Sequence, residues 1–292
     1  MNAGIAFGLG AYLLWGLFPL FFRAVAHVPP LEILAHRVLW TLAFVLAILA
    51  VQRNWSWLRT LATCPRVLAT FALSALMVSV NWGVYILAAT TDRVIDATLG
   101  YFMNPLVNVM LGALVLHERL RRVQWIAVAM AAGGVLWLTL QAGKLPWIGL
   151  TLGLSFGFYA LLRKTAALGA VEGLAAETLL MVPVAVAWLA WAGTHGQETA
   201  SAGTMGTWLL LAASGPVTAV PLLLFAAAAR RIRLSTLGLI QYLGPSMQLV
   251  MAIAWFGEPF GVNRALGYGA IWLALVIYSV DGLRTRRTVA HG

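Results

Sequence analysis

The stretch Ala97-Thr-Leu-Gly-Tyr-Phe-Met-Asn-Pro-Leu-Val-Asn-Val109 has a counterpart 140 residues later, Leu237-Gly-Leu-Ile-Gln-Tyr-Leu-Gly-Pro-Ser-Met-Gln-Leu249. Both stretches combine an apolar run with one proline and several amide or tyrosine side chains. The same register aligns Pro105 with Pro245, Asn108 with Gln248, Arg93 with Arg233 and Glu118 with Glu258. A shift of 141 aligns the earlier segments, for example Gly16 with Gly157. We therefore predict two copies of one unit, at residues 1–142 and 143–292.

The composition indicates that this chain folds in a lipid bilayer. Of its 292 residues, 62% are hydrophobic and 10% are charged, whereas soluble domains carry about a quarter charged residues. A helix needs about 20 apolar residues to cross the bilayer. Segments of that kind fall at roughly 4–24, 31–51, 68–90, 95–116, 123–141, 147–164, 173–192, 206–228, 234–255 and 262–281. The sequence thus predicts an all-α membrane protein of ten transmembrane helices. Because five helices make one unit, the second unit is inverted relative to the first.

Basic residues orient the predicted helices. With the N-terminus in the cytoplasm, 14 of the 19 Lys and Arg residues fall in cytoplasmic loops or in the tail, as the positive-inside rule requires. An even number of helices then places both termini in the cytoplasm.

The net charge of +10 does not indicate a nucleic-acid partner, because the arginines lie in short groups rather than on one basic face. The single cysteine, Cys64, excludes an internal disulfide and a cysteine-rich metal site, and we expect no metal and no other cofactor.

The two aligned prolines, Pro105 and Pro245, predict helix breaks at matching positions. Proline removes one backbone hydrogen bond and kinks a helix. In transporters with inverted repeats, such paired interruptions mark the substrate site, and the two halves open it to each side in turn. The alternative is that both prolines only shape the packing of helices.

Polar side chains within the apolar segments predict a cavity, because such groups turn away from lipid. The predicted lining consists of Asn81, Tyr85, Tyr101, Asn104, Asn108, Gln241, Tyr242 and Gln248. Trp15 and Trp82 also lie deep within their segments. The alternative is that the amides hydrogen-bond to neighbouring helices and serve only to join them.

Ionisable residues within the segments are candidates for coupling or gating. His36 and Arg37 lie in the second segment, and Glu177 lies in the seventh. A histidine or a buried glutamate can exchange protons near neutral pH, so protons are a candidate coupling ion. The alternative is that these side chains form ion pairs near the membrane–water interface or extend to that interface. Glu118 lies beside Arg119 and other arginines, so we expect a surface ion pair there.

Several other classes of function find little support in the sequence. Motifs of zinc proteases, serine hydrolases and ATPases are missing from it. Asp92 and Asp96 could hold Mg²⁺ against a diphosphate, as in an intramembrane prenyl-transfer enzyme, but Arg93 lies between them and a second acidic cluster is missing. A channel and a non-transporting sensor or assembly partner remain as alternatives, although a sensor would need a domain that passes on its signal.

Taken together, several motifs resemble one known family. They are Glu32-Ile-Leu-Ala-His-Arg37, Ser79-Val-Asn-Trp-Gly-Val-Tyr85, the stretch 97–109, Glu118-Arg-Leu120, Gly157-Phe-Tyr-Ala-Leu-Leu-Arg-Lys164, Glu177-Thr178 and Gln241-Tyr-Leu-Gly-Pro245. The chain resembles the RarD-type branch of the EamA drug/metabolite transporter superfamily over nearly its whole length. It departs from that pattern at Ala89-Thr-Thr-Asp92.

The resemblance implies two EamA repeats of five helices each, cytoplasmic termini and a bacterial inner-membrane location. It also implies export of small metabolites or drugs. We therefore expect a secondary transporter that works by alternating access on a small-molecule solute. A homodimer is a candidate assembly state.

Overall fold

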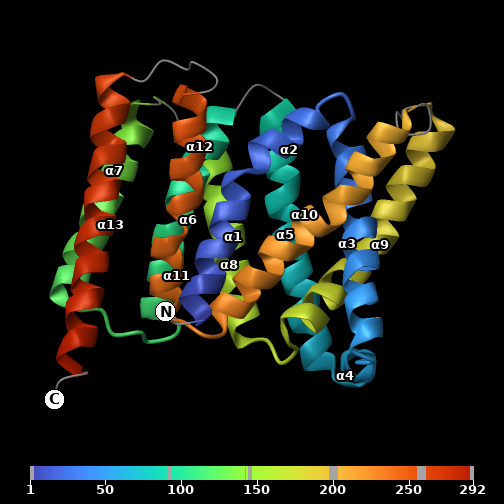
Figure 1. Cartoon of the computed structure of the whole chain (residues 1–292), viewed down its shortest axis with the longest axis horizontal. Helices are drawn as coiled ribbons and strands as arrows, with labels where there is room; N and C mark the ends of the chain where they lie inside the picture. Colours follow the sequence, from blue (N-terminus) through green and yellow to red (C-terminus); the bar gives the residue numbers. More distant parts are fainter. Residues whose placement is uncertain are drawn as a thin grey trace.

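The computed structural model of the chain describes residues 3–90, 94–141, 143, 147–196, 203–254 and 261–289, and this part is a bundle of helices without strands (Figure 1). The helices are α1 (Ala3–Gly16), α2 (Phe18–Ala24), α3 (Pro30–Val51), α4 (Ser56–Thr63), α5 (Pro65–Thr90), α6 (Val94–Leu114), α7 (Arg122–Gln141), α8 (Trp147–Thr165), α9 (Ala170–Thr194), α10 (Met205–Ala229), α11 (Leu234–Ile240), α12 (Leu243–Ala254) and α13 (Val262–Val289). The all-helical prediction is confirmed.

Helix boundaries follow from local chemistry. Pro30 and Pro65 begin α3 and α5, at the first helical position where the missing N–H costs nothing. After α7 and α9, Gly143 and Gly196 adopt φ values of +68° and +63°, in the left-handed region that commonly ends a helix. Between the predicted segments 31–51 and 68–90, the structure contains the short helix α4.

Helices lie on all ten predicted segments, and six described stretches are long and apolar enough to cross a membrane. These six are Ala3–Ala24, Pro30–Val51, Pro65–Tyr85, Arg122–Gln141, Ala170–Thr194 and Met205–Ala229. A shorter apolar stretch lies at Ala265–Tyr278 in α13. The structure thus supports a multi-pass membrane protein, and the number ten stays a prediction.

Two predicted segments are interrupted. The first segment divides into α1 and α2 at Leu17, and the ninth divides into α11 and α12 at Gln241 and Tyr242. The second interruption lies up to four residues before Pro245, where the proline ring crowds the preceding carbonyl and its nitrogen cannot donate. By contrast, α6 continues through Pro105.

The outside of the bundle is apolar. Large side chains such as Leu140, Val184 and Leu209 are 67%, 74% and 63% exposed. A soluble monomer rarely carries an extended apolar surface of this kind, but in the bilayer these side chains face hydrocarbon.

The most extensive helix contacts join the first part of the chain to the second. The helix α7 packs on α13, and α6 packs on both α8 and α11. Further contacts join α1 to α10 and α12, α3 to α9 and α10, and α5 to α8. In Figure 1, α7 and α13 stand together at one side of the bundle, while α3 and α9 stand at the other.

Two glycines allow helices to cross closely. A Cβ atom on Gly16 of α1 would lie 2.9 Å from the sulfur of Met247 in α12. A Cβ atom on Gly157 of α8 would overlap with a methyl group of Val107 in α6. Small residues at such positions let membrane helices approach each other.

Candidate substrate cavity

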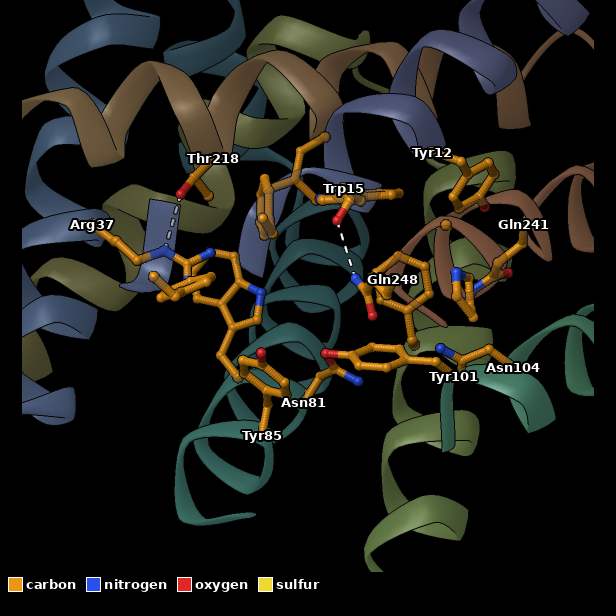
Figure 2. A pocket seen from close by; sticks show the side chains of 17 residues that line it. Tyr12, Trp15, Arg37, Asn81, Tyr85, Tyr101, Asn104, Thr218, Gln241 and Gln248 are labelled. Carbon is orange, nitrogen blue, oxygen red and sulfur yellow. Dashed lines mark hydrogen bonds between the residues drawn. The ribbon is translucent and has the colours of Figure 1, made fainter. Parts of the chain in front are cut away.

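A cavity of about 100 Å³ lies among α1, α2, α3, α5, α6, α8, α10 and α12. Aromatic residues are the largest group in its lining, together with several amides and one cation (Figure 2). The lining residues are Tyr12, Trp15, Phe18, Phe22, Arg37, Asn81, Trp82, Tyr85, Tyr101, Asn104, Phe156, Thr218, Leu222, Gln241, Gly244, Pro245 and Gln248. Concave sites that combine apolar walls with a few polar groups are typical of small-molecule binding.

The structure brings most of the predicted lining together. Six predicted residues line the cavity: Asn81, Tyr85, Tyr101, Asn104, Gln241 and Gln248. Arg37, predicted for coupling or gating, and Pro245, predicted as a helix break, line it too. The deep tryptophans Trp15 and Trp82 are also part of the wall.

Two predicted lining residues lie elsewhere. Asn108 is buried behind the wall, where its amide donates to Oε1 of Gln241 at 2.7 Å and so holds that side chain in place. Tyr242 packs in a different apolar cluster, with its ring centroid 6.2 Å from that of Phe102. Tyr242 therefore packs behind the wall, whereas its neighbour Gln241 lines the cavity.

Some polar groups of the wall form hydrogen bonds within the protein, and others have no such partner among the described residues. The amide of Asn81 donates to the carbonyl of Leu152 at 3.0 Å and to the hydroxyl of Ser155 at 3.1 Å. Gln248 donates to the carbonyl of Trp15 at 3.1 Å. Within the described part of the chain, neither Oδ1 of Asn104 nor the hydroxyl of Tyr12 has a hydrogen-bond partner. Since buried polar groups are normally paired, these two atoms stand out as unused hydrogen-bonding groups of the wall.

Arg37 is the charged group of the wall. Its side chain is held between two rings, with the guanidinium carbon 5.3 Å from the centroid of Phe22 and 4.8 Å from that of Trp82. Its Nε donates to the hydroxyl of Thr218 in α10 at 3.0 Å. Arg37 is 5% exposed, and the lining residues include no carboxylate.

His36 and Glu177, the other coupling candidates, do not line this cavity. The ring of His36 packs edge-on against Trp208 at 5.5 Å. Glu177 forms a buried cluster in which its carboxylate lies 3.4 Å from Nη1 of Arg163 and accepts from Ser74 at 2.5 Å and from Tyr159 at 3.4 Å. Both charged side chains are 1% exposed, so this cluster is a buried ion pair.

Glu118 differs from the expected surface ion pair. Its carboxylate accepts from the backbone N–H groups of Leu234 and Ser235 at 2.7 and 3.0 Å, and from the Ser235 hydroxyl at 2.7 Å. Nε of Arg233 lies 3.7 Å away. Glu118 therefore caps the N-terminus of α11, where carboxylates are favourable.

The predictions missed several aromatic and small residues of the wall. Tyr12 lies three positions before Trp15 in α1, so it shares one helix face with that deep tryptophan. Phe22, Phe156 and Thr218 come from three further helices. The spacing in α1 could have indicated its inward face, but Phe and Thr in an apolar helix are compatible with both lipid-facing and packed positions. Of the aspartates weighed for prenyl transfer, Asp92 lies outside the described residues.

Comparison with known proteins agrees with this fold. Residues 2–140 match the profile of the EamA-like transporter family. Protein RarD of Streptomyces exfoliatus is 47% identical over 287 residues, covering 98% of this chain and 91% of that protein. An uncharacterized transporter of Pseudomonas aeruginosa is 43% identical, covering 98% and 96%, and Protein RarD of Escherichia coli strain K12 is 42% identical, covering 97% and 96%.

A solved crystal structure has the same fold, with a TM-score of 0.74 at 18% identity, covering 96% of this chain and 98% of that chain. The fold and the sequence relatives together define a class of multi-pass membrane transporter. The chain belongs to the EamA-like transporter family, and within it the chain is similar to proteins named RarD. The predicted resemblance is confirmed.

Proposed function

We propose that this protein is a secondary transporter that exports a small solute through the cavity by alternating access. The observation that carries the proposal is the cavity itself, an aromatic and amide wall enclosed by helices from both parts of a transporter-family chain. Such a wall binds a solute reversibly, and rearrangement of the helices around it would expose it to each side in turn.

The helix contacts support two inverted units at residues 1–142 and 143–292. Gly16 meets Met247, and Gly157 meets Val107. A shift of 141 relates the two glycines, and a shift of 140 relates Val107 to Met247. The crossing of α1 with α12 is thus the counterpart of the crossing of α8 with α6. In each crossing a glycine from the first helix of one unit meets a side chain from the fourth predicted segment of the other unit. Exchange between two such arrangements is the physical basis of alternating access.

The cap at Glu118 supports a closed arrangement at one end of the bundle. It joins the segment after α6 to the start of α11, at the end where α1 begins and α13 finishes (Figure 1). We infer that this end is cytoplasmic because the loops with most of the arginines lie there. With ten spans, both termini would then face the cytoplasm of a bacterial inner membrane.

Glu177 is the residue that we retain as a candidate for proton coupling. Tyr159 donates to Glu177, and the ring of Tyr159 lies 5.6 Å from that of Phe156 in the cavity wall. A change at the Arg163 and Glu177 pair could therefore reach the cavity through packed rings. A protonophore should abolish concentrative export if protons drive it.

The first experiment compares small molecules inside and outside bacteria that express wild type, Asn104→Ala with Gln241→Ala, or no protein. Export predicts that a compound accumulates outside only with the wild type. The matched control is Gln141→Ala with Asn263→Ala, because these two residues form an Asn–Gln hydrogen bond of 3.2 Å away from the cavity. This control should export as the wild type does.

Other outcomes of this experiment favour other functions. Identical profiles for all strains would contradict export and favour a sensor or assembly partner. Sustained ion current through the purified protein in a planar bilayer would identify a channel instead of a carrier. Wild-type export by the cavity variant would show that the solute path lies elsewhere.

A further inference from the structure

Two buried arginines of this protein have opposite environments. Arg163, 2% exposed, lies 3.4 Å from the carboxylate of Glu177 and donates to the carbonyl of Ala170 at 2.8 Å. Arg37, 5% exposed, makes one side-chain hydrogen bond to the described residues, with Thr218. It forms no ion pair with any carboxylate that the structure describes.

An unpaired cation in such a place is costly. Buried charges are normally paired, because desolvation of a lone ion is unfavourable. A guanidinium has five N–H donors in a planar fork, and Thr218 uses only one of them. The rings of Phe22 and Trp82 offset part of the cost, since an aromatic face attracts a cation. Within the described residues, the guanidinium of Arg37 therefore keeps donors that an anion could accept from.

The rest of the wall defines the shape of that anion. Figure 2 shows Arg37 beside Thr218 at one end of the cavity, and Asn104 with Gln241 at the other. Trp15 and Tyr101 lie between the two ends. A solute that fits this order has a carboxylate at one end, a flat apolar body and a neutral hydrogen-bonding group at the other end.

We propose that the cavity binds a small aromatic carboxylate, with its carboxylate on the guanidinium of Arg37 and its ring among the aromatic side chains of the wall. This assignment rests on the proposed transport function and names its substrate class. Because the lining has no carboxylate to pair an ammonium group, the site favours a net anion over a zwitterionic amino acid. The available oxygen of Asn104 accepts from a polar group on the far end of the solute.

The test measures binding to the purified full-length protein by isothermal titration calorimetry. The probes are 3-(4-hydroxyphenyl)propionate, its neutral amide, tyrosine and acetate. Charged hydrogen bonds contribute about 1.5–3 kcal/mol, so the aromatic acid should bind about tenfold or more tightly than the amide. Tyrosine tests the added ammonium group, and acetate tests the contribution of the ring. Both should bind more weakly than the aromatic acid.

Variants then locate the carboxylate. Arg37→Gln should lower the affinity for the aromatic acid by about tenfold or more and leave that for the amide unchanged. Arg231→Gln is the matched control, because Arg231 also lies over a ring, that of Phe7 at 5.2 Å, but outside the cavity. It should bind all probes as the wild type does. If Arg37→Gln does not fold, the affinities of the wild type for the acid and for the amide still test whether the cavity binds a carboxylate.

Equal binding of the acid and the amide, binding of neither, or equal binding of the acid and tyrosine would overturn the substrate class. None of these results would overturn transport itself, which the export experiment in cells tests independently. A wild type that binds the acid selectively but exports nothing would instead contradict the transport function while supporting the anion site.

Discussion

At the scale of single residues, the buried ion pair of Arg163 and Glu177 should be important for stability. Removing one partner of a buried pair leaves an uncompensated charge and costs about 3–5 kcal/mol. We therefore expect Glu177→Ala to lower the thermal midpoint of the purified protein markedly. Arg163→Met with Glu177→Leu should recover much of the loss, because apolar residues of similar volume can replace such pairs. Equal midpoints for wild type and Glu177→Ala would contradict this prediction.

The residues of the cavity also mark the limit of prediction from sequence. Asn81, Asn104 and Gln241 were predictable because an amide within an apolar segment has to avoid lipid. Asn108 and Tyr242 satisfy the same rule but are buried behind the wall, since the rule excludes lipid without choosing between a cavity and a packed core. Tyr12 and Phe156 were missed because aromatic side chains are stable in lipid, core and cavity alike.

At the scale of helices, the crossing of α8 with α6 depends on Gly157. Gly157→Ala would overlap with Val107, and overpacking costs about 1–3 kcal/mol. Thermal unfolding should therefore occur at a lower temperature. Val107→Ala in the same chain should restore part of the stability by removing the methyl groups concerned. As a control, Gly83→Ala should be tolerated, because a Cβ atom there would meet nothing within 4 Å.

The stability of the first turn of α11 should depend on Glu118, and amide hydrogen exchange can measure this dependence. Loss of a capping side chain costs about 0.5–2 kcal/mol. In Glu118→Ala, the amides of Leu234 and Ser235 should exchange faster, because both now donate to the Glu118 carboxylate. Amides in the middle of α10 should keep their wild-type rates. Unchanged exchange at Leu234 and Ser235 would exclude the cap as a stabilising contact.

The sequence predicted the presence of the helices better than it predicted where they begin, end or break. Long apolar runs locate the segments, since only a helix can satisfy its own backbone in lipid. The interruptions at Leu17 and at Gln241 were not placed, because they depend on how neighbouring helices satisfy the freed backbone groups. Pro105 and Pro245 illustrate the point, as one lies inside a continuous helix and the other just after a break.

At the scale of the whole molecule, the predicted topology can be tested with reporter fusions. Alkaline phosphatase is active only outside the cytoplasm, whereas green fluorescent protein exported in the same way does not fluoresce. With five spans in the first unit, phosphatase fused after Gly143 should be active. Fused after Val289, it should be inactive, and the fluorescent protein should fluoresce there. Equal activity at both positions would rule out an odd number of spans in the second unit.

The two close helix crossings are not chemically alike. At one of them Gly16 meets the thioether of Met247, and at the other Gly157 meets the β-branched Val107. Methionine has three rotatable bonds and adapts to a shifting neighbour, whereas valine is stiff at its single torsion. Exchanging the two units in the proposed cycle therefore does not give two identical arrangements, and the outward-open and inward-open states differ in free energy. The outward and return strokes of a carrier built from two similar units then run at different rates, even when the cavity binds its cargo equally well from both sides.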